Sequence, residues 1–306
     1  MKFQTLFFAI CFSACASQIK ISETPGVNKT SNAAPEEWRS VDPENLLLID
    51  TRYGQVAVEL APHFAPAHFA RMRQAVRGHF FDGLTFYRVV DGFVAQGGSG
   101  DDDSFPDAKR AALVKPYPPI KAEFDVAISK DENFTPLGNS DPFAPEVGHL
   151  DGFPVGRDHA ENREWILHCP GTFAFARDSK ADTASTEFYV VIGQAPRRLD
   201  RNLTAFGRVI SGMEFLQKLN RGVPEINSGV IANEKKRDPI LRMKIAADLP
   251  EKNRPAFEIL RTESEFFSQL KDKKRHPGTD FLVRAPPPIL DICLIRVEHR
   301  AIGRLD

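Results

Sequence analysis

Short segments of alternating apolar and polar residues recur along the chain and predict a protein built mainly of β-strands. Val56, Val58 and Leu60 alternate with polar or small residues, which is the period of a half-buried strand. The apolar run 46–49 precedes them across a turn at 51–54, so this opening predicts a hairpin. Further strands are expected at 85–90, 93–96, 172–176, 187–192, 205–210 and 241–245.

Two helical patterns lie between these strands. Apolar residues at Phe69, Met72 and Val76 follow the spacing of one helical face, and Gly78 marks its end. A second, short helix is predicted over 213–219. Several strands with only two helices among them indicate an antiparallel barrel or a sandwich.

Three segments depart from this pattern. Residues 17–45 are polar without periodicity and predict a linker or tether, and residues 99–165 are rich in proline and predict a long loop insertion. Residues 250–306 predict an α/β C-terminal extension, whose helix begins at the capping box Thr262–Glu265 and runs to about Lys274. Late strands are expected at 281–283 and 292–297.

The first residues have the pattern of an export signal. Lys2 precedes an apolar run, 6–12, that is too short to span a bilayer. The small-x-small triplet Ala14–Ala16 predicts removal of a signal peptide, 1–16, whereas the four residues ending at Cys15 resemble a bacterial lipobox, after which Cys15 would carry a lipid. A retained anchor is the third alternative. The protein is therefore expected to be exported, as a periplasmic protein or an outer-membrane lipoprotein, and to meet a membrane only through a lipid on Cys15.

The remaining candidates for cross-links or metal ligands are few. Cys169 and Cys293 could pair in an oxidising compartment, and the alternative is that both are small buried hydrophobic side chains. No CxxC motif or Cys/His cluster occurs in the sequence, so a zinc site is not expected. Asp101–Asp103 indicates a solvated acidic loop, with calcium binding as the alternative.

The composition is that of a soluble globular protein and narrows the choice of partners. Of 306 residues, 42% are hydrophobic and 26% are charged, which excludes a disordered or collagen-like chain. Lys and Arg number 40 against 41 Asp and Glu, so the net charge of -1 gives no general attraction to phosphates, and no nucleic acid is expected as a partner. The chain has 24 Phe against 4 Tyr and 2 Trp, which indicates a core or pocket built of rings without polar groups.

The stretch Phe80–Gly98, FFDGLTFYRVVDGFVAQGG, resembles the signature of the cyclophilins, a class of peptidyl-prolyl cis-trans isomerases. The segments that follow the same family in order and spacing are Gly171–Arg177, Thr186–Val190, Leu199–Asp200 and Phe206–Met213. Together they cover 46–249, the expected cyclophilin-like domain. The resemblance implies a closed eight-stranded antiparallel barrel capped by two helices, an active groove on its outer face, and an isomerase that needs no cofactor or metal.

Arg88 is the candidate for the catalytic group within this stretch. A prolyl amide resists rotation by about 18–20 kcal/mol because its nitrogen shares a lone pair with the carbonyl group. In the twisted state the nitrogen regains that lone pair, and an N–H group of a guanidinium can donate a hydrogen bond to it. This interaction stabilises the twisted state more than the planar amide. A period of two places Phe86, Arg88 and Val90 on one face of their strand, and Val94 and Gln96 on one face of the next.

The resemblance also implies roles for other residues. The implied catalytic set is Arg88, Phe93 and Gln96, in which Gln96 orients Arg88 or holds a substrate carbonyl. The implied substrate-binding residues are Val94, Ala176, Arg177, Glu187, Tyr189, Leu199 and Leu203.

Three departures from the family pattern leave more than one function open. Glu187 replaces a usual Gln and could pair with Arg88, while Arg198 and Leu203 replace a usual aromatic residue and a usual His. The leading interpretation is a monomeric prolyl isomerase that acts on proline-containing polypeptides and assists the folding of exported proteins. The alternatives are a non-catalytic module that docks proline-containing segments, and an envelope lipoprotein whose residues 250–306 bind a partner.

Overall fold

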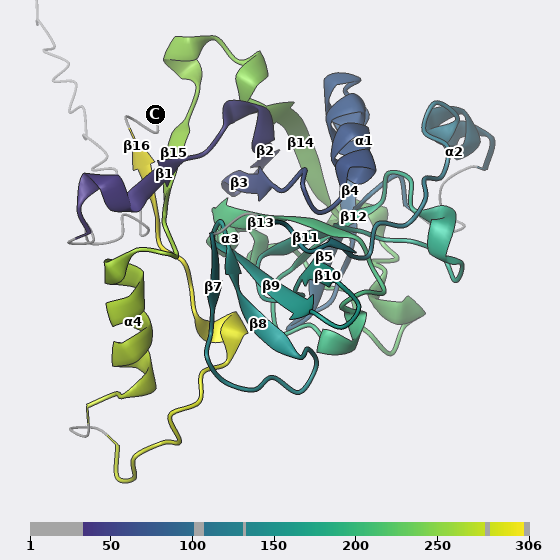
Figure 1. Cartoon of the computed structure of the whole chain (residues 1–306). Coiled ribbons are helices and arrows are strands. Elements are labelled where there is room, and N and C mark those ends of the chain that lie inside the picture. The colour runs from purple at the N-terminus through teal and green to yellow at the C-terminus, as the bar shows by residue number, and fades with distance from the viewer. Residues whose placement is uncertain (1–32, 101–106, 131–132, 279–281, 303–306) are drawn as a thin grey trace, which may run out of the picture. The chain divides into compact units, whose positions relative to one another are not determined.

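The computed structural model of this chain describes residues 33–100, 107–130, 133–278 and 282–302 (Figure 1). The predicted signal peptide with Cys15, residues 17–32 of the predicted linker, and Asp101–Asp103 lie outside the described residues. None of the described helices is both long and apolar enough to cross a membrane.

Eight antiparallel strands form a closed barrel in the order β11-β12-β5-β4-β14-β2-β3-β13. Their bounds are β2 (Leu46–Thr51), β3 (Gly54–Leu60), β4 (Thr85–Val89), β5 (Val94–Gly98), β11 (Thr172–Phe175), β12 (Phe188–Val191), β13 (Ala205–Ser211) and β14 (Asp238–Ile245). The predicted hairpin is present, since Leu47 pairs with Val58. Because β11 pairs with both β12 and β13, the sheet closes and has no free edge. The expected closed eight-stranded antiparallel barrel is therefore confirmed.

Phenylalanine rings fill the interior of this barrel. The fully buried rings are Phe81, Phe86, Phe173, Phe175, Phe188 and Phe206. Most neighbouring rings meet edge to face, as Phe173 and Phe206 do with centroids 5.3 Å apart, whereas Phe173 and Phe188 are stacked. The helices α1 (Pro66–Arg77) and α3 (Met213–Leu216) bury Met72 and Leu216 in the same core, and α3 is shorter than the predicted 213–219.

The insertion is a folded sheet, so the prediction of a long loop is wrong. Its five antiparallel strands lie in the order β6-β10-β9-β8-β7. Their bounds are β6 (Val126–Ala127), β7 (Phe134–Pro136), β8 (Glu146–Leu150), β9 (Phe153–Asp158) and β10 (Arg163–Ile166), and α2 (Asp107–Val114) precedes them. One face packs on the barrel through Leu150 and Val155, and the other buries Val147 and Trp165 in a second core. Strands that are buried on both faces show no polar alternation, which is why the sequence pattern missed them.

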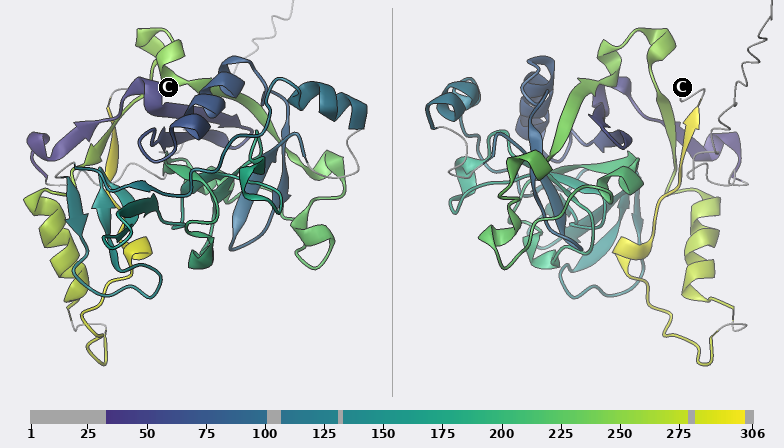
Figure 2. Two further views of the ribbon diagram at one scale, coloured as in Figure 1. Left: turned by 45° about the vertical axis from the view of Figure 1, so that its right-hand side comes forward. Right: turned by 180° about the vertical axis from the view of Figure 1, so that it is seen from behind.

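The C-terminal extension folds together with the end of the predicted linker. Its elements are β15 (Ala256–Leu260), α4 (Glu265–Arg275) and β16 (His299–Ile302). The strand β1 (Trp38–Ser40) pairs with β15, which also pairs with β16. Residues 33–45 are therefore not a free tether, and a strand of only 3 residues is too short for its alternation to be recognised. Figure 2 shows α4 and the barrel helix α1 on opposite sides of the described part of the chain.

Two details of the extension differ from the prediction. The predicted helix is present as α4, but its N-cap is Ser264, whose hydroxyl accepts a backbone N–H of the first turn, and not Thr262. Ile292–Leu294 forms a 3-10 helix in place of the expected strand 292–297, and residues 282–283 belong to no strand. Short apolar runs fit a strand or a helical turn equally well, so their pattern could not decide between the two.

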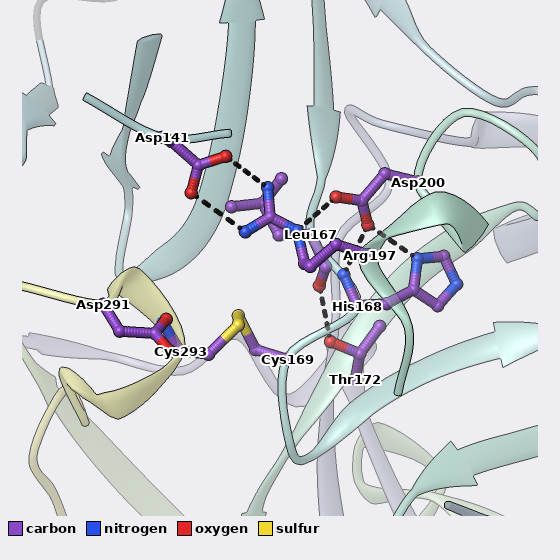
Figure 3. The surroundings of a disulfide bond; sticks show 9 residues. All are labelled: Asp141, Leu167, His168, Cys169, Thr172, Arg197, Asp200, Asp291 and Cys293. Atoms are coloured by element: carbon purple, nitrogen blue, oxygen red, sulfur yellow. Dashed lines mark hydrogen bonds and ion pairs between the residues drawn. A yellow bond between two sulfur atoms is a disulfide. The ribbon is translucent and has the colours of Figure 1, made fainter. Parts of the chain in front are cut away.

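A disulfide joins Cys169 to Cys293, whose Cα atoms are 4.9 Å apart (Figure 3). The sequence left open whether these cysteines pair or are separate buried side chains, and in the structure they are paired. Cys169 lies just before β11, and Cys293 lies in the 3-10 helix of the extension, so the bond ties the extension to the barrel. The second core around it gathers side chains from the insertion and the extension, among them Val147, Trp165, Leu260, Phe267 and Ile292.

Two histidines of the added parts, the buried His149 and the half-buried His299, have lowered pKa values. His149 of β8 is 1% exposed, and its ring lies edge-on to Phe267 of α4 with centroids 5.2 Å apart. Burial, followed by the charges of Arg208 and Lys271, lowers the pKa of His149 from 6.5 to about 3. Burial, followed by the charge of Arg208, lowers the pKa of His299 to about 4. Both rings are therefore uncharged in the folded protein at neutral pH.

We expect the free energy of unfolding to fall as the pH is lowered from 7 to 5. In the unfolded chain both histidines take up a proton near pH 6.5, whereas in the fold they stay neutral down to about pH 4. The unfolded state thus binds more protons in this window, and His149 alone accounts for a loss of about 2 kcal/mol between pH 7 and 5. Urea titrations at these pH values measure the loss. His149→Leu should flatten the dependence, and an unchanged slope in that variant would refute the assignment.

Candidate active site

Arg88 on β4 lies opposite Gln96 on β5. The register of the two strands shifts just before Arg88, so β4 does not keep a period of two. Phe86 and Val89 both enter the barrel core, and the prediction that Arg88 shares a face with Phe86 is wrong. On β5, Ala95 belongs to the barrel core, so the side chain of Gln96 lies on the outer face, where Arg88 reaches it.

Three contacts hold the guanidinium of Arg88. Its Nη1 donates to Oε1 of Gln96 over 3.1 Å, and its Nε donates to the carbonyl oxygen of Ser228 over 2.8 Å. Its central carbon lies 5.8 Å from the centroid of the Phe93 ring. Gln96 is held in turn, because its Nε2 donates to the hydroxyl of Tyr87 over 2.6 Å. Among the residues that the structure describes, none accepts a hydrogen bond from Nη2 of Arg88.

Ser228 is a partner of Arg88 that the sequence pattern did not predict. Asn227, Ser228 and Gly229 have left-handed φ angles of 51°, 52° and 85°. This turn directs the Ser228 carbonyl toward Arg88, and Val230 forms a bridge with Arg88 directly after it. The only local signal is the Asn-Ser-Gly sequence, which is typical of turns but does not say what the turn contacts.

The charge of Arg88 is partly shielded from water. Burial lowers the pKa of Arg88 from its ordinary value, and the neighbouring Tyr87 opposes this shift. A guanidinium nevertheless stays charged at neutral pH. The site therefore presents a cation whose orientation is set by its own protein before a substrate binds.

Six predicted site residues meet in one apolar cluster next to Arg88. They are Phe93, Val94, Ala176, Tyr189, Leu199 and Leu203. Val94 and Tyr189 are buried, and the other four are half-buried. Phe93 belongs to the cluster and also contacts the Arg88 cation, so the apolar and charged parts of the site adjoin each other.

The two charged residues of the predicted substrate-binding set have structural partners. Oε1 of Glu187 accepts hydrogen bonds from the backbone N–H and the hydroxyl of Ser99, over 2.9 and 2.7 Å. The predicted pairing of Glu187 with Arg88 is wrong, because the contacts of Arg88 do not include it. Arg177 donates from Nε to the carbonyl oxygen of Asn202 over 2.9 Å and so connects two loops beside the apolar cluster.

Tyr189 contacts a buried histidine, His168, for which the sequence predicted no role in the site. Its hydroxyl lies 2.8 Å from Nε2 of His168, and Nδ1 of His168 lies 3.0 Å from Oδ1 of Asp200. Since a carboxylate only accepts, Nδ1 of His168 donates to Asp200, and Nε2 is hydrogen-bonded to the Tyr189 hydroxyl. Burial, followed by the charge of Asp200, raises the pKa of Tyr189, so this hydroxyl stays protonated. His168 stands in an apolar run, Leu167–Cys169, where a buried structural role is the ordinary interpretation.

The chemistry available around Arg88 is limited to binding and polarisation. The groups that meet there are an amide, a backbone carbonyl, a phenol and a phenyl ring. None of these is a nucleophile or a proton acceptor of useful strength at neutral pH. The arrangement suits a reaction in which a bond rotates and no bond breaks.

Comparisons with known proteins agree with this geometry. Residues 46–245 match the family described as cyclophilin type peptidyl-prolyl cis-trans isomerase. A probable peptidyl-prolyl cis-trans isomerase of Brucella suis is 28% identical over 240 residues, which are 77% of this chain and 96% of that protein. Peptidyl-prolyl cis-trans isomerase B of Bacillus subtilis is 27% identical over 168 residues, which are 55% of this chain and 85% of that protein. The crystal structure of cyclophilin AquaCyp293 from Hirschia baltica is similar with a TM-score of 0.68 and 26% identity, and covers 90% of this chain and 100% of that one.

The chain therefore belongs to the cyclophilin-type peptidyl-prolyl cis-trans isomerases, as the resemblance implied. It is an enzyme of the class that interconverts the cis and trans forms of prolyl peptide bonds, and its substrates are proline-containing polypeptides. The similarity to AquaCyp293 extends beyond residues 46–245, since it covers 90% of the chain.

Proposed function

We propose that Arg88 catalyses prolyl rotation by donating a hydrogen bond from Nη2 to the prolyl nitrogen. One observation carries this proposal: Gln96 and Ser228 hold the other two nitrogens of the guanidinium, which leaves Nη2 for a substrate. A guanidinium fixed at two nitrogens cannot turn, so the direction of its third donor is set in advance. The planar amide has no free lone pair to accept this bond, whereas the twisted amide does. The bond therefore stabilises the transition state more than the ground state.

The apolar cluster receives the pyrrolidine ring in this proposal. The half-buried Phe93 offers aromatic surface and the half-buried Leu199 adds an aliphatic contact, while the buried Tyr189 belongs to the same cluster. Burying the ring there fixes the proline while the carbonyl group before it turns past Arg88. Phe93 contacts both the apolar cluster and the guanidinium, which places the cation beside the bound ring. This supports one role for the cluster, in binding proline, and another for Arg88, in stabilising the twisted amide.

A protease-coupled isomerisation assay tests the activity itself. The purified chain is added to a chromogenic tetrapeptide with one X-Pro bond, and the rate of cis-to-trans conversion is followed. We expect a rate above the spontaneous one that rises in proportion to the protein concentration. A rate equal to the spontaneous one would leave the non-catalytic docking module as the function of this fold.

We further propose that the substrates are exported proteins. The export-signal pattern before Ser17 supports this, and so does the Cys169–Cys293 disulfide, because disulfides persist in oxidising compartments outside the cytosol. Fractionation of cells that express the chain with a C-terminal tag should recover it from the envelope. Its intact mass should show a lipid on Cys15 or a start at Ser17, and an unprocessed Met1 in the cytosolic fraction would overturn the proposal.

A further inference from the structure

Tyr189 of the apolar cluster begins a series of polar contacts that leads away from the barrel. Its hydroxyl is hydrogen-bonded to Nε2 of His168 over 2.8 Å, and the two rings stack with centroids 6.2 Å apart. His168 is 1% exposed, and its backbone N–H and its Nδ1 both donate to Oδ1 of Asp200, over 2.8 and 3.0 Å. The position of the Tyr189 ring thus depends on where Asp200 holds His168.

Asp200 is connected to Asp141 of the insertion through the side chain of Arg197, as Figure 3 shows. Its second oxygen, Oδ2, accepts a hydrogen bond from Nε of Arg197. The two terminal nitrogens of Arg197 donate to the two oxygens of Asp141, each over 3.2 Å. Asp141 lies between β7 and β8. The side chains of Arg197 and Asp141 are both 10% exposed, so salt screens this bidentate pair only weakly.

The same ion pairs hold a second member of the apolar cluster. Arg197 begins the 3-10 turn Arg197–Leu199, and Asp200 is its C-cap. Leu199 therefore lies between the two residues that these ion pairs fix. Movement of Arg197 would displace Leu199 as well as Tyr189.

The C-terminal extension is bonded to residues close to His168 and Asp141 of this series. Cys169 follows His168 directly and is bonded to Cys293 of the extension. The side-chain amide of Asn139 donates to the carbonyl oxygen of Leu290 and accepts its backbone N–H, each over 3.1 Å. Asn139 stands two residues before Asp141, so the loop that carries Asp141 rests on the extension.

We propose that the insertion and the extension together position the apolar cluster for proline binding. Asp141 is the positioning residue, and it acts through the ion pairs above on Tyr189 and Leu199. This inference rests on the proposed function. It concerns the docking of the proline ring and not the rotation step, because the contacts of Arg88 are with Gln96, Ser228 and Phe93, none of which is Tyr189, His168, Asp200, Arg197 or Asp141.

A double-mutant cycle between Asp141 and Tyr189 tests the proposal. Asp141→Asn keeps the shape of the side chain and removes the charge that pairs with Arg197, and Tyr189→Phe keeps the ring and removes the hydroxyl. We expect each variant to raise KM for a prolyl tetrapeptide by about three- to tenfold while kcat stays within about twofold. The double variant should raise KM no further than the larger single effect, because both changes interrupt the same series of contacts.

A matched control comes from the insertion itself. Glu146→Gln changes the hydrogen-bonded contact of the Glu146 carboxylate with His159, which is no part of this series, and should leave KM unchanged. If the KM effects of Asp141→Asn and Tyr189→Phe multiply, or if Asp141→Asn keeps the wild-type KM, the proposal is wrong. Arg197→Lys keeps the charge but cannot span both carboxylates, and it gives the same test if Asp141→Asn does not fold.

A failure of the positioning role can be distinguished from a failure of the proposed catalytic function. Calorimetry can measure the Kd of a peptide containing Ala-Pro for the wild type, the two single variants and the double variant. This measurement needs no turnover. Absence of catalysis in the wild type would defeat the proposed function and leave this test intact. Multiplying effects on Kd in an active enzyme would defeat the positioning role alone.

Discussion

Replacing Arg88 by Ala is expected to lower kcat for a prolyl tetrapeptide by about 10²–10³-fold, or about 3–4 kcal/mol of transition-state stabilisation. The decisive hydrogen bond goes from Nη2 to a nitrogen that has a free lone pair only in the twisted state. Its loss therefore lowers kcat and leaves KM nearly unchanged. The protease-coupled assay over a range of substrate concentrations separates the two constants.

Two variants serve as controls for this result. Arg88→Lys keeps the charge but cannot bond to Gln96 and Ser228 while presenting a third nitrogen, so it should recover only part of the activity. Phe93→Ala should act mainly on KM, because Phe93 belongs to the apolar cluster that receives the ring. If Arg88→Ala has the circular dichroism of the wild type and also its kcat/KM, another group must stabilise the twisted amide.

Removing the Cys169–Cys293 disulfide is expected to lower the free energy of unfolding by about 2–5 kcal/mol. The bond joins residues 124 positions apart, so it strongly restricts the unfolded chain. Cys169 is buried, and replacing both cysteines by Ala introduces no larger side chain into the second core. Urea unfolding of Cys169→Ala/Cys293→Ala against the oxidised wild type measures the difference.

The location of the tryptophans makes this measurement specific. The chain has 2 Trp residues, Trp38 and Trp165, and both lie in the second core that the disulfide borders. Their fluorescence therefore reports the region that the bond ties together. Wild type treated with a reductant should unfold at the same urea concentration as the double Ala variant. Equal midpoints for oxidised and reduced wild type would show that the disulfide does not limit unfolding.

The part of the candidate site that lies close together in the sequence could be predicted. Arg88, Phe93 and Gln96 lie on or between two neighbouring strands, so strand pairing alone brings them together. The acceptor at Ser228 lies 140 positions from Arg88, and no local pattern connects them. The partner of Glu187 was predicted wrongly for the same reason, because Ser99 meets it only where the barrel brings the two together.

The sequence by itself determined the barrel strands, the helices α1 and α4 and the family, because these depend on alternation, spacing and motif residues within short windows. The tertiary structure decided the shift of register before Arg88, which reversed the predicted side of Phe86. It also decided that the proline-rich insertion is a sheet buried on both faces, and that Asp141 pairs with Arg197 behind the apolar cluster. The register shift lies between two neighbouring strands, and the alternation of residue types does not reveal it. The other two features depend on contacts between residues far apart in the chain, and the free energy of such a contact depends on a partner that no local window contains.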